Sequence, residues 1–234
     1  MKQAYAKHYR IIEDKHWWFQ GRQAILESIC KRYINPPARI LDIGCGIGNI
    51  LKALSSLGDC YGMDHDRTMI DYARKRGLNI SWGSLPIHFH AFNLFDVILL
   101  FDVLEHCDEE ALALKNIKFH LKSDGLFILT VPAYQWLWSS HDVVNEHKRR
   151  YTRGSLIRLL KKNGFKIWES TYFNTLLFPL VILGKFFFRH KDGHIEIPHL
   201  VINSMLKKIF KLEAKILKYL SFPFGGSILI VCSK

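Results

Sequence analysis

The sequence predicts an α/β fold in which helices cover both faces of a mostly parallel sheet. Short apolar runs alternate with helix-like segments through about residue 131, which is typical of parallel strands joined by helical crossovers. The first apolar run, residues 38–43, continues directly into a glycine-rich turn, as expected of a buried parallel strand. The 234 residues are enough for one large core, and a composition of 49% hydrophobic and 23% charged residues excludes a disordered or collagen-like chain.

Strands and helices can be assigned in order along the chain. Strand-like segments are residues 38–44, 60–64, 79–83, 95–106, 126–132, 165–174 and 227–234. Helix-like segments are residues 24–34, 49–57, 67–77, 109–121 and 152–164. In the first helix, Ile25, Leu26, Ile29 and Cys30 share one face. Roughly fifty residues separate the last two strands, too many for an ordinary connection, so an insertion is expected there.

The positive charge is concentrated in two segments. The formal net charge is +12, and residues 145–166 (eight basic, one acidic) and 185–218 (eight basic, three acidic) account for all of it. This concentration indicates either an anionic partner, such as nucleic acid or membrane headgroups, or simply a solvated basic face.

Cysteine spacing and the start of the chain bear on the compartment. The five cysteines are scattered without a CxxC pair, which argues against a disulfide framework or a thiolate zinc site and favours a reducing compartment. The first residues are too charged for a signal peptide, so we expect a cytoplasmic protein.

The glycine-rich turn is the strongest chemical signal. Gly44, Gly46 and Gly48 alternate between a strand and a helix, where backbone can approach a ligand closely. About twenty residues on, Asp64 ends the second strand, where a carboxylate can accept both hydroxyls of a ribose. Asp42 would repel a pyrophosphate but can anchor water or an ammonium group. This combination suits a ligand with an amino-acid end and a nucleoside end, namely S-adenosylmethionine.

Several motifs resemble those of a known family. LDIGCGIGN, GMD, DVLEH and DGLFILTVP, within residues 38–131, resemble the class I S-adenosylmethionine-dependent methyltransferases. HWWF near the start and HDVVNEHKRRYT after the fifth strand resemble a type 11/23, ubiquinone-methyltransferase-like subgroup. The resemblance implies a Rossmann-like, seven-stranded, mostly parallel sheet with an antiparallel last strand, and S-adenosylhomocysteine as the product.

The resemblance also implies where the cofactor lies. Gly44 and Gly46 would pass under its methionine part, and Asp64 would hold the ribose. The adenosyl group would lie near three consecutive residues, Phe101, Asp102 and Val103. Ser84 stands where the family commonly has an acid facing the adenine, and Cys45 and His65 are expected beside the same site.

Two polar clusters are candidates for catalysis. His106 can face the methyl acceptor as a general base, while Glu105 more simply stabilises the turn. His141, Asp142 and His147 can form a base with its orienting carboxylate, or metal ligands as in the quinone-type relatives. With one carboxylate beside two histidines, no metal is expected there.

The aromatic triplet 17–19 and Arg22 precede the sheet. Three consecutive aromatic residues cannot all face one side of a helix, so at least one is expected to cover the core. The others would form a lid over the cofactor, with Arg22 binding its carboxylate.

Two segments of the insertion indicate a surface. Residues 176–188 are nearly all apolar but too short to span a bilayer. In residues 205–220 five lysines form one stripe of a helix, with apolar residues opposite: Lys207, Lys208, Lys211, Lys215 and Lys218. Such a helix either binds the inner face of an anionic membrane or caps the acceptor pocket with its lysines solvated.

The expected organisation has four parts: a helical lid at 1–37, a methyltransferase core at 38–174, a helical cap at 175–222 and a final strand at 223–234. The favoured function is methyl transfer to oxygen of a small, hydrophobic or lipid-linked acceptor. An RNA methyltransferase and a non-catalytic cofactor-binding protein are the alternatives; nucleic acid is less favoured because no RNA-binding module is present. The oligomeric state is left open.

Overall fold

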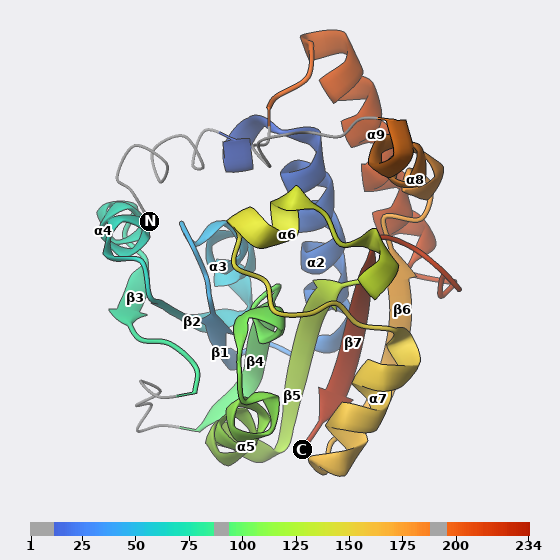
Figure 1. Ribbon diagram of the computed structural model, residues 1–234. Coiled ribbons are helices and arrows are strands. Elements are labelled where there is room, and N and C mark those ends of the chain that lie inside the picture. Colours follow the sequence, from blue (N-terminus) through green and yellow to red (C-terminus); the bar gives the residue numbers. More distant parts are fainter. Residues whose placement is uncertain (1–11, 87–93, 188–195) are drawn as a thin grey trace.

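A seven-stranded sheet forms the centre of the computed structural model, which describes residues 12–86, 94–187 and 196–234 (Figure 1). The strands are β1 (Ala38–Ile43), β2 (Gly58–Asp64), β3 (Asn79–Trp82), β4 (Phe95–Phe101), β5 (Leu121–Pro132), β6 (Lys166–Phe173) and β7 (Ser227–Ser233). Their spatial order is β3-β2-β1-β4-β5-β7-β6. β7 is antiparallel to both of its neighbours and all other pairs are parallel, which confirms the predicted mostly parallel sheet with an antiparallel last strand.

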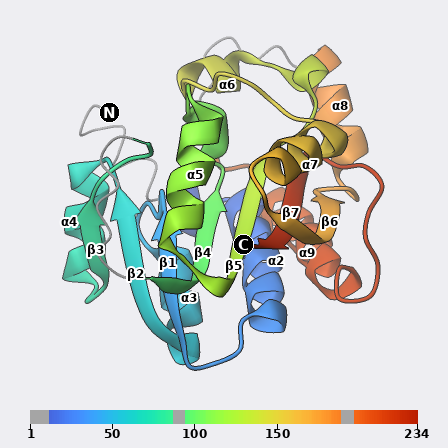
Figure 2. The ribbon, with the colours of Figure 1, turned by 90° about the horizontal axis from the view of Figure 1, so that it is seen from below.

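Helices cover both faces of this sheet (Figure 2). The α-helices are α2 (Trp17–Tyr33), α3 (Asn49–Leu54), α4 (Arg67–Lys75), α5 (Glu110–His120), α6 (Ser140–Val144), α7 (Arg153–Lys162), α8 (Phe178–Phe187) and α9 (Leu200–Ile216). Short 3-10 turns follow α3, β4 and β5: η1 (Ser55–Leu57), η2 (Leu104–His106) and η3 (Gln135–Leu137). α5 and α7 pack on one face, and α2, α3 and α9 pack on the other.

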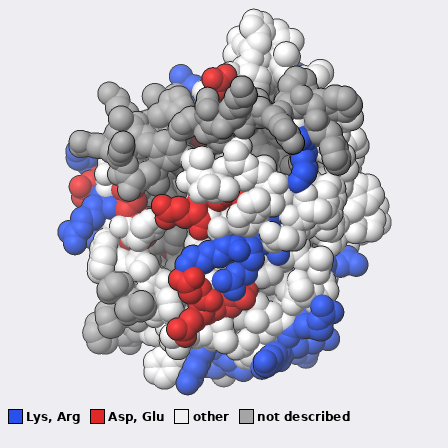
Figure 3. Space-filling model, viewed as in Figure 1, with Lys and Arg blue, Asp and Glu red and all other residues white. Residues whose placement is uncertain are grey.

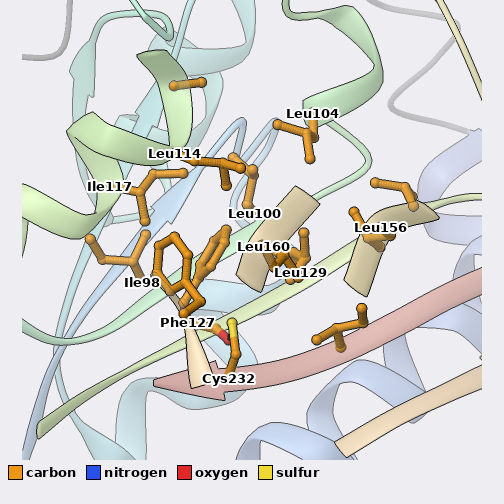
Figure 4. Close-up of a cluster of buried hydrophobic side chains, with 14 of the residues drawn as sticks. Ile98, Leu100, Leu104, Leu114, Ile117, Phe127, Leu129, Leu156, Leu160 and Cys232 are labelled. Carbon is orange, nitrogen blue, oxygen red and sulfur yellow. Dashed lines mark hydrogen bonds between the residues drawn. The ribbon is translucent and has the colours of Figure 1, made fainter. Parts of the chain in front are cut away.

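Each face of the sheet has its own apolar core. Leu114 and Ile117 of α5 and Leu156 and Leu160 of α7 meet strand residues such as Phe127 on one face (Figure 4). On the other face, the predicted stripe of the first helix is buried as expected, at no more than 2% exposure: Ile25, Leu26, Ile29 and Cys30. Because both sheet faces are covered, the central strands are apolar on both sides rather than alternating.

Side-chain caps set several helix boundaries. Asp66 accepts hydrogen bonds from the backbone N–H groups of Thr68 and Met69 at the start of α4. Thr152 and Ser155 form a reciprocal capping pair at the start of α7, where the sequence places the helix start.

Three elements begin at least five residues earlier than the sequence indicates. α2 begins at Trp17 rather than residue 24, because His16 caps it through the backbone N–H of Trp18. α9 begins at Leu200 rather than residue 205. β5 begins at Leu121, before the expected turn, since a register shift against β4 accommodates the extra residues.

The two inserted helices occupy different places, which differs from the single cap expected at 175–222. α9 packs against α2 on the face of the sheet opposite α5 and α7. There the Phe210 ring of α9 stacks on Phe173, with centroids 6.4 Å apart, and meets Trp17 edge-on at 5.8 Å. α8 instead lies beside the carboxyl ends of the strands, where Val181, Gly184 and Lys185 line a cleft. The reason is that one face of α9 carries Phe210, Ala214 and Leu217, which complete the core against α2.

None of the described helices is both long enough and apolar enough to cross a bilayer.

Candidate functional site

A cleft of about 1890 Å³ opens at the carboxyl ends of β1, β2 and β4. The strand order reverses between β1 and β4, and in open α/β sheets this switch point is where ligands bind. All predicted cofactor residues line this cleft: Arg22, Asp42, Gly44, Cys45, Gly46, Asp64, His65, Ser84, Phe101, Asp102 and Val103. The sequence motifs therefore converge on one site, although they come from five separate stretches of chain.

The glycine loop shapes the floor of the cleft. Gly44 and Gly46 have φ values of 76° and 54°, in the left-handed region that favours glycine. A Cβ at Gly44 would lie 2.3 Å from Cγ2 of Val103, whereas a Cβ at Gly46 would have no described atom within 4 Å. Gly46 therefore borders open space into which a ligand can approach the backbone.

Asp64 is held in a fixed orientation at the end of β2. Its Oδ2 accepts a hydrogen bond from the backbone N–H of Gly46 at 2.8 Å, and its Oδ1 accepts one from Asp66 at 2.9 Å. The neighbouring His65 is exposed, with Nδ1 3.6 Å from Asp64 Oδ1. Each carboxylate oxygen retains a lone pair, so Asp64 can still accept the two hydroxyls of a ribose.

Asp42 is a buried carboxyl group that still needs a partner. Its side chain lines the cleft although the residue is only 3% exposed, and it makes no hydrogen bond or ion pair with another residue in the described ranges. Burial raises the pKa of Asp42 to about 8, and the nearby Arg22 opposes the shift. A cationic group on a ligand would supply the missing partner, as the sequence suggested for an ammonium.

Arg22 and Asp102 form an ion pair across the cleft wall. Nε and Nη2 of Arg22 lie 2.7 and 2.6 Å from Oδ2 of Asp102, and Thr130 donates a hydrogen bond to Oδ1 at 3.1 Å. Asp102 has a φ of 58°, a strained value for a non-glycine residue. The sequence assigned these residues to the carboxylate end and the adenosyl end of the cofactor. In the structure the two side chains bind each other, so this ion pair links α2 to the carboxyl end of β4.

The aromatic triplet lies between the apolar core and the cleft. Trp17 packs edge-on against Phe210 of α9, with ring centroids 5.8 Å apart. Trp18 contacts Phe19 at 5.0 Å and lies beneath the Arg22 guanidinium at 5.6 Å. All three rings line the cleft, and Trp17 and Trp18 also pack against the apolar core, which confirms the expected core role. The lid function remains a prediction.

The second half of the cleft contains the histidines. His106, His141 and His147 all line it, with the His106 and His147 rings 4.8 Å apart. Burial lowers the pKa of His106 to about 4, so the ring is neutral at pH 7. The His141 ring lies beside the side-chain amide of Asn145, 3.1 Å away. These histidines are the candidate bases of the site.

Asp142 lies behind the cleft wall and contacts His147, in the orienting role that the sequence predicted for a carboxylate beside a histidine base. It is fully buried, and its carboxylate contacts His147 Nδ1 at 2.9 Å, Arg150 Nε at 2.7 Å and the backbone N–H of Ser139 at 2.8 Å. Hydrogen bonds from His147 and Arg150 outweigh burial and hold the pKa of Asp142 far below its ordinary value. Asp142 therefore orients His147, not the adjacent His141, and acts as a positioning residue.

Glu105, His106 and His147 form a group whose ligand atoms all lie within 4.8 Å of one another. Glu105 is fully buried, neither carboxylate oxygen has a hydrogen-bond partner among the described residues, and burial raises its pKa well above the ordinary value. One carboxylate and two imidazoles can hold a divalent cation. The sequence grouped His147 with His141 and Asp142 and expected no metal there; the fold keeps that group and also brings His106 and Glu105 beside His147.

Several other residues of the cleft were given no individual role by the sequence, although His16 belongs to the HWWF motif and residues 181–185 to the apolar segment 176–188. Glu13 and His16 line it from the N-terminal segment, and Val181, Gly184 and Lys185 line it from α8. Glu13 lies three residues before the HWWF motif, which is the nearest clue to its position.

A Rossmann-like sheet with a glycine loop, a ribose-binding acid and a cleft at the switch point defines a nucleoside-cofactor enzyme of the α/β class. Residues 15–170 match the family model described as a methyltransferase domain. The chain belongs to this family, and S-adenosylmethionine is the cofactor that membership assigns to it. The predicted resemblance is thereby confirmed.

Curated relatives and solved structures agree with this assignment. The ubiquinone biosynthesis O-methyltransferase of Rickettsia felis is 25% identical over 140 residues, covering 57% of this chain and 52% of that protein. That of Bradyrhizobium diazoefficiens is 30% identical over 107 residues, covering 42% and 41%. The chain thus spans about half the length of the curated relatives it matches.

Two solved structures share the fold. A Haloferax volcanii methyltransferase in complex with the Trm112 methyltransferase activator has a TM-score of 0.65 at 18% identity, covering 98% of this chain and 94% of that one. Phosphoethanolamine N-methyltransferase 2 of Haemonchus contortus, in complex with S-adenosyl-L-methionine, has a TM-score of 0.61 at 20% identity, covering 93% and 52%.

The cleft fits this cofactor. The fixed Asp64 carboxylate suits the ribose, the open space at Gly46 admits the ligand to the backbone, and the partnerless Asp42 suits a cationic group.

Proposed function

We propose that the protein transfers a methyl group to an oxygen atom of a small, hydrophobic or lipid-linked acceptor. The supporting observation is the form of the cleft, which continues from the cofactor residues past three histidines to an apolar wall. That wall comes from the loop after β5, from α6 and from the insertion: Leu137, Trp138, Val144, Val181, Ile197 and Pro198. The relatives named as ubiquinone biosynthesis O-methyltransferases support both the apolar acceptor and the oxygen atom.

Bound S-adenosylmethionine supplies an activated methyl group on a sulfonium, so the chain mainly has to position the acceptor and remove its proton. The neutral His106 ring can accept a hydroxyl proton directly. His147 is the better oriented base, since Asp142 holds its Nδ1 and leaves Nε2 for the acceptor side. Trp18 and Phe19 exclude water from the cofactor half of the cleft.

Labelled methyl transfer tests this function. Purified protein is incubated with S-adenosylmethionine carrying a labelled methyl group, together with either a lipid extract or total RNA. We expect label in the organic phase, strongly lowered by Asp64→Ala, reduced in His147→Ala, and unchanged in the control Asp71→Ala, whose residue is exposed on α4 and does not line the cleft. Label in RNA alone would overturn the acceptor class, and label in neither fraction with bound cofactor would favour a non-catalytic protein.

The basic charge favours a membrane over RNA. In the run 145–166, Lys148 pairs with Asp108, Arg149 with Glu110 and Arg150 with Asp142, so three of its eight cations are already neutralised. Figure 3 shows acidic and basic side chains side by side over the middle of this face. Paired cations contribute little to binding phosphates.

The α9 helix supports attachment to the inner face of an anionic membrane, and with it a cytoplasmic location. Four lysines of the stripe are exposed, and so are apolar side chains of the same helix: Leu200, Val201, Ile202, Met205 and Leu212. Each lysine near such a surface contributes about 1 kcal/mol. Replacing Lys207, Lys208, Lys211, Lys215 and Lys218 with Gln should release the protein from anionic liposomes and leave cofactor affinity intact. A wild type that never sediments with these liposomes at low salt would refute the membrane attachment.

A further inference from the structure

The wall of the cleft beside the glycine loop carries more acidic than basic groups. Glu13, Asp42 and Asp64 all line it, and they are close enough that Glu13 and Asp64 each raise the pKa of Asp42. Arg22 is the largest opposing influence on both Glu13 and Asp42, but its guanidinium is already paired with Asp102. A cation that binds here would meet three carboxyl groups and one arginine that is already paired.

Two of these carboxyl groups have no basic partner among the described residues. Asp42 is only 3% exposed and makes no hydrogen bond or ion pair with another described residue. Glu13 accepts only a long hydrogen bond, 3.4 Å, from the side-chain amide of Asn49. Burial raises the pKa of Glu13 to about 7, with Arg22 and Arg76 opposing and Asp14 and Asp64 reinforcing the shift. A carboxyl group with a raised pKa ionises when a ligand brings a positive charge beside it, and the resulting ion pair stabilises the bound ligand.

The insertion holds Glu13 in place from 190 residues away in the chain. Residues 12–15 are helical, and Ile12 is buried. The buried Asn203 of α9 accepts a hydrogen bond from the backbone N–H of Trp17 and donates one to the carbonyl of Lys15, both at 2.8 Å. The Asn203 side chain therefore binds the backbone on both sides of the capping residue His16.

We propose that Glu13 is a cofactor-binding residue which, together with Asp42, forms a cation-selective wall that favours S-adenosylmethionine over S-adenosylhomocysteine. The proposal rests on the proposed methyltransferase function. Both ligands carry the α-ammonium group, but only S-adenosylmethionine carries the sulfonium charge. Methyl transfer breaks the sulfur–methyl bond, the electron pair returns to sulfur, and the product is a neutral thioether. An acidic wall therefore holds the substrate form more tightly and releases the product.

Calorimetric titration with each ligand tests the proposal. For Glu13→Gln we expect S-adenosylmethionine affinity to fall about tenfold, which is about 1.4 kcal/mol, and S-adenosylhomocysteine affinity to fall about threefold. The matched control is Asp14→Asn, since Asp14 is exposed, does not line the cleft, and lies 3.3 Å from the same Asn49 amide. Affinities of the control should stay within twofold of wild type for both ligands.

A second variant tests the role of α9. Asn203→Ala should release the N-terminal segment and lower S-adenosylmethionine affinity, and adding Glu13→Gln to it should have little further effect. Unchanged affinities in Glu13→Gln would overturn Glu13 as a binding residue, and equal losses for both ligands would overturn the selectivity. A wild type that binds neither ligand would instead refute the proposed function itself, which separates the two failures.

Discussion

The buried carboxylate of Asp142 allows a sharp test of how the acceptor side of the site is stabilised. The variant Asp142→Asn keeps the shape of the side chain and one carbonyl acceptor but removes the charge. Arg150, whose side chain is only 12% exposed, then loses its counter-ion, and His147 loses the acceptor that orients it. Both partners come from the run of basic residues after α6, so this loop depends on a single carboxylate.

The expected loss of stability is large. Removing one partner of a buried ion pair costs about 3–5 kcal/mol, because the remaining charge stays buried without compensation. Since Asn keeps one acceptor, we expect about 3 kcal/mol, the lower end of that range. For a chain of this size each kcal/mol lowers the melting temperature by about 2–4 °C, so the variant should melt about 6–12 °C below wild type.

Thermal unfolding monitored by circular dichroism at pH 7 is the assay, with Asp108→Asn as the control. Asp108 pairs with Lys148 of the same loop but is 79% exposed, so its removal should cost less than about 1 kcal/mol. Because the pKa of Asp142 is lowered in the folded state, its contribution is present above pH 4 and is lost as the pH falls through the folded-state pKa. The gap between the variant and wild type should therefore narrow below pH 4. Melting of Asp142→Asn within 2 °C of wild type at pH 7 would refute the reasoning.

Three further predictions concern the cofactor site and the packing of the insertion. Asp64→Ala should weaken S-adenosylmethionine binding by about 1.5–3 kcal/mol, roughly 10- to 150-fold in calorimetry, through lost hydrogen bonds to a charged acceptor; unchanged affinity in a folded variant would contradict the ribose assignment. Gly21→Ala should lower the free energy of unfolding by about 1–2 kcal/mol, measured by denaturant unfolding. The added Cβ would lie 2.3–2.8 Å from atoms of Phe210, and this overpacking outweighs the better helix propensity of Ala. A stabilised variant would show that α2 and α9 can separate. Burial raises the pKa of Glu213 to about 7, so the folded state keeps a proton there that the unfolded state loses. The melting temperature of wild type should therefore fall as the pH rises from 4.5 to 7, and Glu213→Gln should reduce this dependence on pH. Equal slopes for both proteins would mean that Glu213 does not titrate in the folded state.

The sequence by itself determined the sheet and the cofactor wall. Parallel strands with helical crossovers are built from neighbouring segments. The alternation of apolar runs and helical patterns was therefore enough to identify β1 to β5 along the chain. The glycine loop and Asp64 were equally accessible, because in this fold the ends of β1 and β2 always meet at one edge. Local backbone geometry, such as the left-handed glycines, enforces that site from within a few residues.

Only the tertiary structure decided which groups become partners across the chain. The lysine stripe of α9 was visible in the sequence, but its buried face carries Asn203 and Glu213, which bind backbone N–H groups of Trp17 and Leu176. Nothing local indicates that a helix near residue 203 will fix the segment that carries Glu13. The sequence likewise left open which histidine Asp142 orients, and the fold selects His147, because His147 and Arg150 fold back onto this carboxylate. Sequence patterns report periodicity and neighbours, whereas the partner of a buried polar group is chosen by whichever distant segment the packed core brings within hydrogen-bond distance.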